Sequence, residues 1–269
     1  MKPLVFAVIN VTPDSFSDGG EFLDTNAAVG RGLQAIAEGA DVLDIGGEST
    51  RPSGSVYGKG TREVSSEEEL ARVIPVIERL RAETDRPISI DTRKSKVAAA
   101  ALKAGARYVN DVSGGTFDPD ILKVAADFGA DMILMHSRGT PETMADRAHY
   151  DDLVSEVRDE LAERAAAAVA AGIAREKIWL DPGLGFAKTP QQSRTLLREL
   201  PTLVSLGFPL LVGPSRKSML GSERPPAERL PESIAAAVLA VQGGAGGLRV
   251  HDVGATIRAL NFLRLAGLG

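Results

Sequence analysis

Eight short apolar segments recur along this chain, and a segment of helical character follows each of them. The apolar segments are 4–9, 42–46, 87–90, 107–110, 132–135, 177–180, 209–213 and 248–250. Short runs that are apolar almost throughout are typical of strands covered on both faces, as in a parallel sheet. The intervening segments predict helices at 25–39, 65–84, 94–104, 118–128, 151–172, 191–206, 231–243 and 252–266. This alternation predicts an α/β protein built around a parallel sheet.

Two of the predicted helices carry clear boundary signals. Segment 65–84 opens with Ser65 and an acidic first turn, and segment 151–172 opens with an aspartate and ends at Gly172. Serine and aspartate are common N-cap residues, and glycine commonly ends a helix. Pro75 lies inside the first segment, where we expect it to kink the helix.

Eight strand–helix repeats on 269 residues fit a single (β/α)8 TIM barrel, which typically takes about 250 residues. No break in composition suggests a linker, so we interpret residues 1–269 as one domain. A doubly wound open sheet shows the same alternation and is the alternative. No GxGxxG motif opens the first predicted helix, which disfavours a dinucleotide-binding fold of that kind.

The composition excludes several classes of site and partner. The chain has no cysteine and three histidines, which excludes disulfides, thiolate metal sites and cysteine nucleophiles. A net charge of −5 argues against nucleic acid and anionic membranes as partners. No apolar run reaches the roughly 18–20 residues that a membrane span needs. We therefore expect a cytoplasmic protein that acts on small molecules.

Polar residues stand at the carboxyl ends of the predicted strands. Asn10, Asp91, Asn110 and Asp181 end the first, third, fourth and sixth of them. In a closed barrel these ends form one ring, at the face where barrel active sites lie. The alternative, that polar residues simply terminate apolar strands, explains one or two such ends more readily than a whole ring. We therefore predict a single site at this face.

The ring has an acidic part and a cationic part. A carboxylate such as Asp91 or Asp181 pairs with two parallel N–H donors, which the N–C(NH₂)–N edge of a planar heterocycle supplies. Arg51, Lys217 and Arg249 follow the second, seventh and eighth strands, and loops after the last two are the usual phosphate site of a barrel. These residues predict a flat heterocyclic ligand with a polyanionic leaving group. Structural salt bridges and a solvated surface cluster remain the alternatives.

Eight motifs that follow one another along the chain narrow this further. They are NVTPDSFSDGG (10–20), DIGGESTRP (44–52), IDTRK (90–94), NDVSGG (110–115), LMHSRGTPETM (134–144), DPGLGFAK (181–188), GPSRKS (213–218) and RVHDV (249–253). Together they resemble the dihydropteroate synthase family from end to end. The resemblance implies a (β/α)8 barrel transferase of folate biosynthesis, with Mg²⁺ as cofactor, a homodimer and competition by sulfonamides. Its reaction condenses 6-hydroxymethyl-7,8-dihydropterin diphosphate with 4-aminobenzoate to give 7,8-dihydropteroate and diphosphate.

The resemblance also implies a role for individual residues. The implied pterin-binding residues are Asp91, Asn110, Met135, Asp181, Phe186, Lys217 and Arg249. The implied diphosphate-binding residues are Asn10, Thr50, Arg51, Arg249 and His251, with Asn10 also as the metal ligand. The implied catalytic residues are Asn10, Arg51, Lys217, Arg249 and His251. The implied 4-aminobenzoate pocket consists of Phe16, Pro52, Lys217 and Ser218, and Asp18 would order the closed loop 11–24.

The chain departs from the family pattern in one segment. Residues 53–64 make the stretch after the TRP motif longer than usual, with Tyr57 and Lys59 at its centre. The pterin assignments do not depend on this segment. The expected lid over the 4-aminobenzoate pocket does depend on this segment.

Two other functions share part of this pattern. A methyltetrahydrofolate-dependent corrinoid methyltransferase domain would use the same pterin floor but would have no use for the cationic cluster. A non-catalytic pterin-binding paralogue would typically have lost Asn10, Arg51 or Lys217, and all three are present. The synthase reaction needs no protein nucleophile, because diphosphate departure from a methylene on an electron-rich pterin leaves a stabilised cation.

Overall fold

The computed structural model describes residues 2–12, 21–49 and 64–268, without the side chains of 21–24. Its strands are β1 (Leu4–Asn10), β2 (Val42–Gly46), β3 (Ile88–Asp91), β4 (Tyr108–Asp111), β5 (Asp131–Met135), β6 (Ile178–Asp181), β7 (Leu211–Val212) and β8 (Gly247–Val250). They are parallel and lie in the order β6-β5-β4-β3-β2-β1-β8-β7. These bounds agree closely with the predicted segments, although β7 is shorter.

The two ends of this strand order meet. Leu180 of β6 forms a parallel bridge with Leu210, just before β7, and its N–H donates to the Pro209 carbonyl at 3.0 Å. The sheet therefore closes on itself. This closure excludes the open doubly wound alternative and confirms the predicted (β/α)8 barrel.

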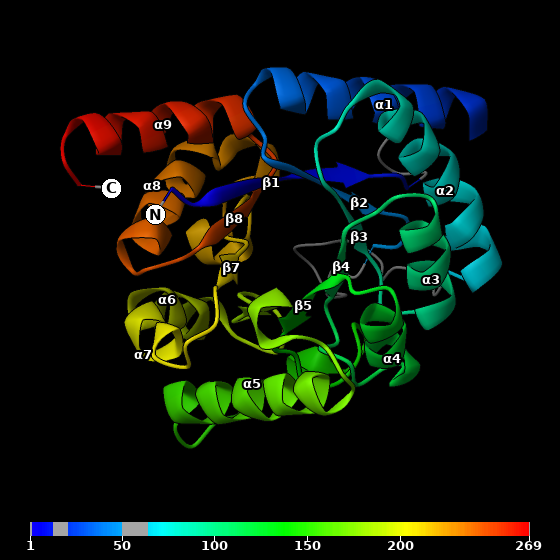
Figure 1. The fold of residues 1–269 in the computed structure, drawn as a ribbon. Coiled ribbons are helices and arrows are strands. Elements are labelled where there is room, and N and C mark those ends of the chain that lie inside the picture. The colour runs from blue at the N-terminus through cyan, green and yellow to red at the C-terminus, as the bar shows by residue number, and fades with distance from the viewer. Residues whose placement is uncertain (1, 13–20, 50–63, 269) are drawn as a thin grey trace.

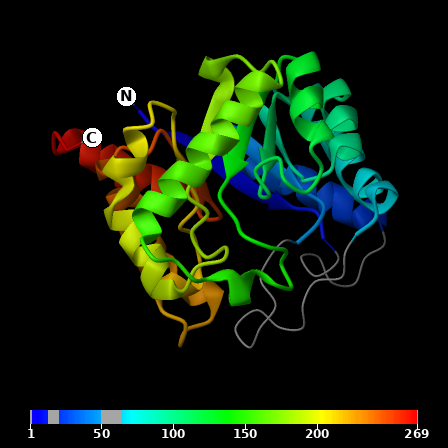
Figure 2. The ribbon, with the colours of Figure 1, turned by 90° about the horizontal axis from the view of Figure 1, so that it is seen from below.

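The described helices surround the barrel and follow one another around it in chain order (Figure 1). They are α1 (Glu21–Ala37), α2 (Ser66–Glu83), α3 (Ser95–Lys103), α4 (Asp120–Asp127), α5 (Leu153–Ala170), α6 (Pro190–Arg198), α7 (Leu200–Val204), α8 (Leu230–Gln242) and α9 (Val253–Leu265). Because β1 pairs with β8, the two chain ends lie near each other, as Figure 1 and Figure 2 both show. In the described part of the chain, no helix combines the length and apolar character of a membrane span.

The predicted helix starts have the expected caps. The Ser65 hydroxyl accepts the Glu68 N–H at 3.1 Å before α2, and the Asp152 carboxylate accepts the Ser155 N–H at 3.1 Å before α5. Each cap satisfies one of the N–H groups that a first helical turn leaves without a backbone partner. Helix α2 continues through Pro75 to Glu83.

The prediction of one helix over 191–206 is wrong. The structure has two helices there, α6 and α7, with Glu199 between them. Pro201 lies in the first turn of α7. Since proline has no N–H to donate, it is tolerated in a first turn but removes a hydrogen bond from the middle of a helix.

The apolar core has two groups of side chains. One packs between the sheet and the surrounding helices, and the other fills the inside of the barrel. The outer group joins sheet residues such as Ile45 and Ile90 to helix residues such as Ile77. The inner group, which we call the barrel plug, consists of Leu4, Phe6, Val42, Tyr108, Ile133, Trp179 and Leu211. The Phe6 ring meets the rings of Tyr108 and Trp179 edge-on, with centroids 5.5 and 6.0 Å apart. The plug fills the interior toward the amino ends of the strands.

Candidate functional site

Beyond the plug, the side chains that point into the barrel become polar. Every second side chain of a strand faces the same side, so residues two positions beyond Val42, Tyr108 and Trp179 also point inward. These residues are Asp44, Asn110 and Asp181. By register, Asp91 lies beside Asn110, Met135 beside Asp181, and Arg249 beside the plug residue Phe6, so these three also point inward. We call Asp44, Asp91, Asn110, Asp181 and Arg249 the polar floor.

Arg249 joins two carboxylates of the polar floor. Its Nε lies 2.5 Å from Asp44 Oδ2, and its Nη2 lies 2.6 Å from Asp91 Oδ2. The Asn110 amide donates to Asp44 Oδ2 at 3.2 Å. Asp44 is completely buried, and a buried charge is costly unless it is paired and hydrogen-bonded in this way. Asp44, Asp91, Asn110 and Arg249 of the polar floor thus form a connected network across β2, β3, β4 and β8.

The network changes the ionisation of Asp91. Burial raises the pKa of Asp91 to about 7, while the Arg249 guanidinium opposes the shift and the Asp44 carboxylate reinforces it. Hydrogen-bond donors favour the ionised form of a carboxyl group. A ligand that brings N–H donors to Asp91 would therefore bind and ionise it together.

Lys217 lies beside the polar floor. Its ammonium group donates to the Leu184 carbonyl and lies 4.9 Å from the centre of the Phe186 ring. Burial lowers the pKa of Lys217 to about 8, and the nearby Asp181 carboxylate opposes this. Burial also raises the pKa of Asp181, whose Oδ1 accepts the Gly183 N–H at 2.7 Å.

Lys217 and Arg249 approach each other across Gly213. A Cβ built on this glycine would lie 3.8 Å from Lys217 Nζ and 3.7 Å from Arg249 Cβ. Of the predicted acidic and cationic residues, Asp91, Asp181, Lys217 and Arg249 therefore share one mouth of the barrel. They are interleaved there, since Arg249 lies among the carboxylates instead of on a separate cationic rim.

Other predicted residues lie around this mouth. Asn10 ends β1 opposite Gly46, and the buried Met135 ends β5 opposite Asp181. His251 follows β8, with its Nδ1 3.0 Å from the Ser215 hydroxyl. Ser218 begins a short 3-10 turn directly after Lys217. The remaining predicted residues lie outside the described part of the chain, and they are Phe16, Asp18, Thr50, Arg51 and Pro52.

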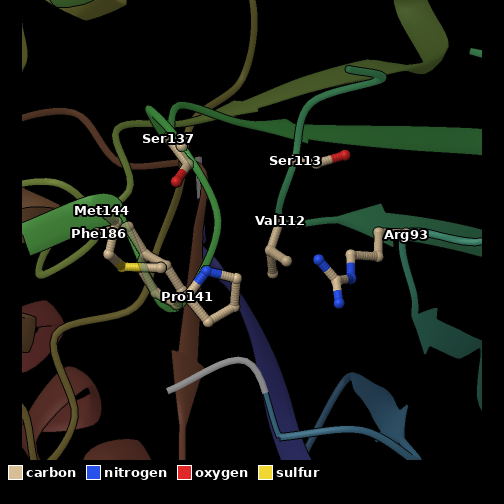
Figure 3. A pocket seen from close by; sticks show the side chains of 8 residues that line it. Arg93, Val112, Ser113, Ser137, Pro141, Met144 and Phe186 are labelled. Carbon is tan, nitrogen blue, oxygen red and sulfur yellow. The ribbon is translucent and has the colours of Figure 1, made fainter. Parts of the chain in front are cut away.

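A small pocket opens among the loops that follow β3, β4, β5 and β6 (Figure 3). Phe186 and Met144 lie on one side of it, and Val112 and Arg93 lie on the other, with Pro141 between them. Phe186 therefore faces this pocket as well as Lys217. This position suits a residue that forms a wall of a binding site.

Some buried charges of the site were not predicted from the sequence. Asp44 is the clearest, and its signal is a carboxylate inside the otherwise apolar segment 42–46. A second group lies just beyond the end of β2, where the Lys94 ammonium is 2.8 Å from Glu48 and 2.6 Å from Glu69. Ion pairs between residues so far apart in the chain follow from the closed barrel and leave no local pattern.

The fold and the site define a barrel enzyme that binds a small polar molecule at the carboxyl ends of its strands. Residues 6–251 match the family of pterin binding enzymes. A dihydropteroate synthase of Synechocystis sp. is 51% identical over 255 residues, which cover 94% of this chain and 86% of that protein. The chain belongs to the dihydropteroate synthase family.

Solved structures agree with this assignment. The Xanthomonas albilineans dihydropteroate synthase with 4-aminobenzoic acid superimposes with a TM-score of 0.91 at 47% identity, covering 100% of this chain and 94% of that chain. The same organism's enzyme in complex with 7,8-dihydropteroate gives a TM-score of 0.87 at 44% identity, covering 100% and 95%. The predicted family, the transferase class and the dihydropteroate synthase function are thereby confirmed.

Proposed function

We propose that this chain condenses 6-hydroxymethyl-7,8-dihydropterin diphosphate with 4-aminobenzoate at the polar floor, giving 7,8-dihydropteroate and diphosphate. The observation that carries the proposal is the placement of buried carboxylates and buried cations in one barrel mouth. The 4-aminobenzoic acid and 7,8-dihydropteroate bound in the Xanthomonas albilineans structures support this choice of acceptor and product.

The carboxylates of the polar floor bind the pterin in this proposal. Asp91 and Asp181 accept hydrogen bonds from the ring's amino and N–H groups, and the Asn110 amide supplies a further polar contact. Arg249 carries two carboxylate partners on its edge, and the faces of a planar guanidinium can stack on a flat ring. Met135 and Phe186 form apolar walls. Burial excludes water, which strengthens each of these hydrogen bonds.

The cations stabilise the departing diphosphate. Arg249 and Lys217 remain positively charged where negative charge develops as the methylene–oxygen bond breaks, and such fixed charges lower the barrier. Asn10, Thr50, Arg51 and His251 complete the diphosphate site in the proposal. The pterin-stabilised cation is then attacked by the amine of 4-aminobenzoate, which is neutral near pH 7 and needs no strong base. The new C–N bond leaves a cationic nitrogen, which gives its proton to the released diphosphate or to solvent.

The acceptor lies next to Lys217 and Ser218 in this arrangement. Phe16 and Pro52 cover its ring, and Asp18 orders the loop that carries Phe16. Exclusion of water matters here, because water would otherwise capture the cation before the amine does.

Mg²⁺ fits the residues at the end of β1. Mg²⁺ prefers oxygen ligands and often binds through one or two protein groups together with substrate phosphates. Asn10 offers an amide oxygen at the mouth, and no cluster of three or more metal-binding carboxylates or histidines exists in the described residues. When bound to Asn10 and diphosphate, Mg²⁺ would neutralise charge on the leaving group.

We also propose that the chain forms a homodimer. Helices α8 and α9 expose Leu239, Phe262 and Leu265, which are 54%, 68% and 81% accessible. Large apolar side chains gathered on neighbouring helices support a protein–protein surface. Analytical ultracentrifugation tests this, and a monomer at all concentrations would contradict it.

The reaction is tested by incubating the protein with the pterin diphosphate, 4-aminobenzoate and Mg²⁺ and following diphosphate release. We expect 4-aminobenzoate to accelerate the release strongly, because the amine captures the cation. Asp91→Ala should lower kcat/KM at least about thirtyfold, as expected for truncating one partner of a buried charge pair. Asp127→Ala, at an exposed ion pair on α4, is the matched control and should be unchanged. Equal activity of the two variants would overturn the proposed pterin site.

A further inference from the structure

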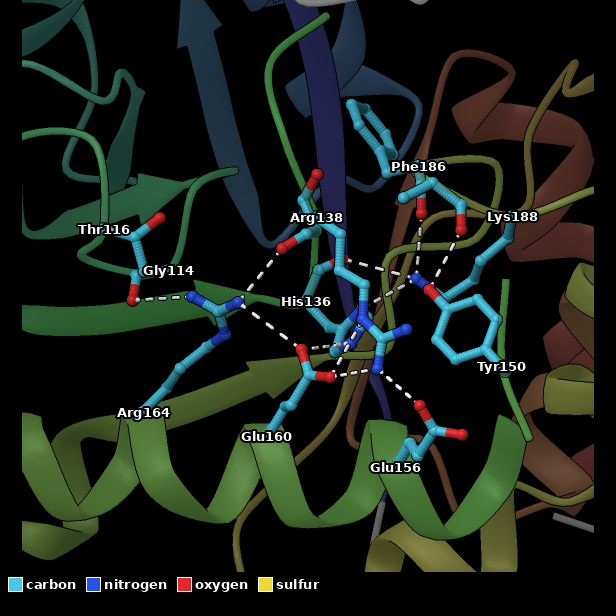
Figure 4. A network of polar contacts seen from close by, with 12 residues as sticks. Gly114, Thr116, His136, Arg138, Tyr150, Glu156, Glu160, Arg164, Phe186 and Lys188 are labelled. Atoms are coloured by element: carbon cyan, nitrogen blue, oxygen red, sulfur yellow. Dashed lines mark hydrogen bonds and ion pairs between the residues drawn. The ribbon is translucent and has the colours of Figure 1, made fainter. Parts of the chain in front are cut away.

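The loop that follows β6 carries a buried lysine (Figure 4). Lys188 is only 7% accessible, and its ammonium group faces three acceptors. They are His136 Nδ1 at 2.8 Å, the Phe186 carbonyl at 2.9 Å and the His136 carbonyl at 3.4 Å. Burial lowers the pKa of Lys188 well below its usual range and the Asp181 carboxylate opposes this, but the group has N–H bonds to donate in either protonation state. The reaction proposed above makes no use of Lys188 or His136.

The surroundings of His136 decide which groups donate. His136 Nε2 lies 3.1 Å from Glu160 Oε2, and contacts with His136 and Arg138 lower the pKa of Glu160 to about 2. The contact lacks hydrogen-bond geometry, but an ionised carboxylate is only an acceptor, which favours a proton on the Nε2 atom that faces it. Burial lowers the pKa of His136 to about 4, so the ring is neutral and its Nδ1 is an acceptor. Lys188 is therefore the donor to His136.

The same loop is held from a second direction. The Tyr150 hydroxyl donates to the Ala187 carbonyl at 2.9 Å, directly beside the Phe186 carbonyl that Lys188 holds. Ala187 has φ of 49°, in the left-handed region that residues other than glycine seldom adopt. Such a conformation persists only where its surroundings enforce it. Lys188 and Tyr150 donate to the successive carbonyls of Phe186 and Ala187 and so hold this conformation.

The residue held in place is Phe186. Its ring lies 4.9 Å from Lys217 Nζ and lines the pocket of Figure 3. The orientation of the Phe186 ring depends on the conformation of backbone 186–188, to which the side chain is attached. We propose that Lys188, supported by His136 and Tyr150, is a positioning residue that sets the Phe186 ring against the pterin. This inference rests on the proposed function.

A double-mutant cycle on the whole enzyme tests the inference. Lys188→Met removes the ammonium group but keeps an unbranched buried side chain. We expect it to raise the KM for the pterin diphosphate about tenfold, with a smaller change in kcat. Phe186→Ala should raise the same KM by a similar factor. The double variant should be no worse than Phe186→Ala alone, because residues that act through one another are not additive.

Two further variants keep the result interpretable. Lys177→Met is the matched control, since Lys177 also donates to a backbone carbonyl, that of Gly129, at the opposite end of β6. It should leave KM unchanged. Tyr150→Phe removes only the hydrogen bond to Ala187 and should raise KM about threefold, again only when Phe186 is present. It provides the measurement if Lys188→Met does not fold.

The outcomes separate this inference from the function on which it rests. If the KM of the double variant rises by the product of the two single-variant factors, the inference is overturned. An unchanged KM in both Lys188→Met and Tyr150→Phe would also overturn it. An unchanged KM in Phe186→Ala would overturn it together with the wall assigned to Phe186. Failure of the unaltered enzyme to release diphosphate would instead overturn the proposed function.

Discussion

At the scale of single residues, the polar floor and Lys217 hold more negative charges than positive ones. Asp44, Asp91 and Asp181 face Arg249 and Lys217, so full ionisation leaves one buried negative charge in excess. Burial of an uncompensated charge is unfavourable, and a proton relieves it. Burial raises the pKa of Asp91 to about 7, with a further contribution from the Asp44 carboxylate, so Asp91 is the group that takes up the proton. A ligand edge with N–H donors stabilises the ionised floor in place of that proton.

This balance predicts a bell-shaped pH dependence of kcat/KM for the pterin diphosphate. Activity should fall below about pH 7 as Asp91 takes up a proton, and above about pH 8 as Lys217 loses one. Lys217→Arg should move only the alkaline limb upward, because a guanidinium stays charged above about pH 12. Steady-state rates across pH 5–10 measure both limbs. An alkaline limb that stays in place in Lys217→Arg would assign it to another group.

Asp44 should control the acid limb. Asp44→Asn removes a negative charge that raises the pKa of Asp91, and it frees Arg249 to pair with Asp91 alone. Both changes favour ionised Asp91, so the acid limb should move to lower pH. The same profile should show kcat/KM reduced about tenfold at its maximum, since Arg249 loses one of its two partners. In the control Asp127→Asn the limb should not move.

At the scale of elements, the sequence predicted strands better than it predicted contacts. Continuous apolar runs identify buried strands, which is why 42–46 agrees with β2 to the residue. The role of Asp44 inside that strand was not predicted, because its partner Arg249 is 205 residues away. Helix 191–206 was wrong because Pro201 favours a new first turn over continuation of the helix. Local patterns determine elements, whereas pairs across the barrel require its closure and register.

The loop after β6 should be the element least tolerant of added atoms. Gly183 has φ of +64°, and a Cβ there would collide with the His136 carbonyl oxygen. Gly185 has φ of +81°, but its nearest neighbour would be Lys217 Cδ at 3.6 Å. Gly183→Ala should therefore lower the free energy of unfolding by about 3 kcal/mol, and Gly185→Ala by only about 1 kcal/mol. Urea denaturation measures both, and equal losses would contradict the predicted collision.

At the scale of the whole molecule, closure connects the site to the core. The polar floor lies directly next to the barrel plug, since Asp44, Asn110 and Asp181 each come two residues after a plug residue on the same inward face of a strand. The plug packs side chains from strands on all sides of the barrel, including Phe6 of β1, Tyr108 of β4 and Trp179 of β6. Because these strands share one interior, we expect residues 1–269 to unfold as a single domain.

The single tryptophan makes this expectation testable, because Trp179 belongs to the barrel plug. In urea, Trp179 fluorescence should report the barrel interior and far-ultraviolet circular dichroism the surrounding helices. We expect the two unfolding curves to coincide, as they do for one cooperative unit. Phe6→Ala should destabilise both by about 3–5 kcal/mol, the usual cost of deleting a buried ring. Phe128→Ala, at a side chain that is 44% accessible and away from α8 and α9, should shift both curves much less. A fluorescence curve that moves alone in Phe6→Ala would show that the helices and the barrel interior unfold separately.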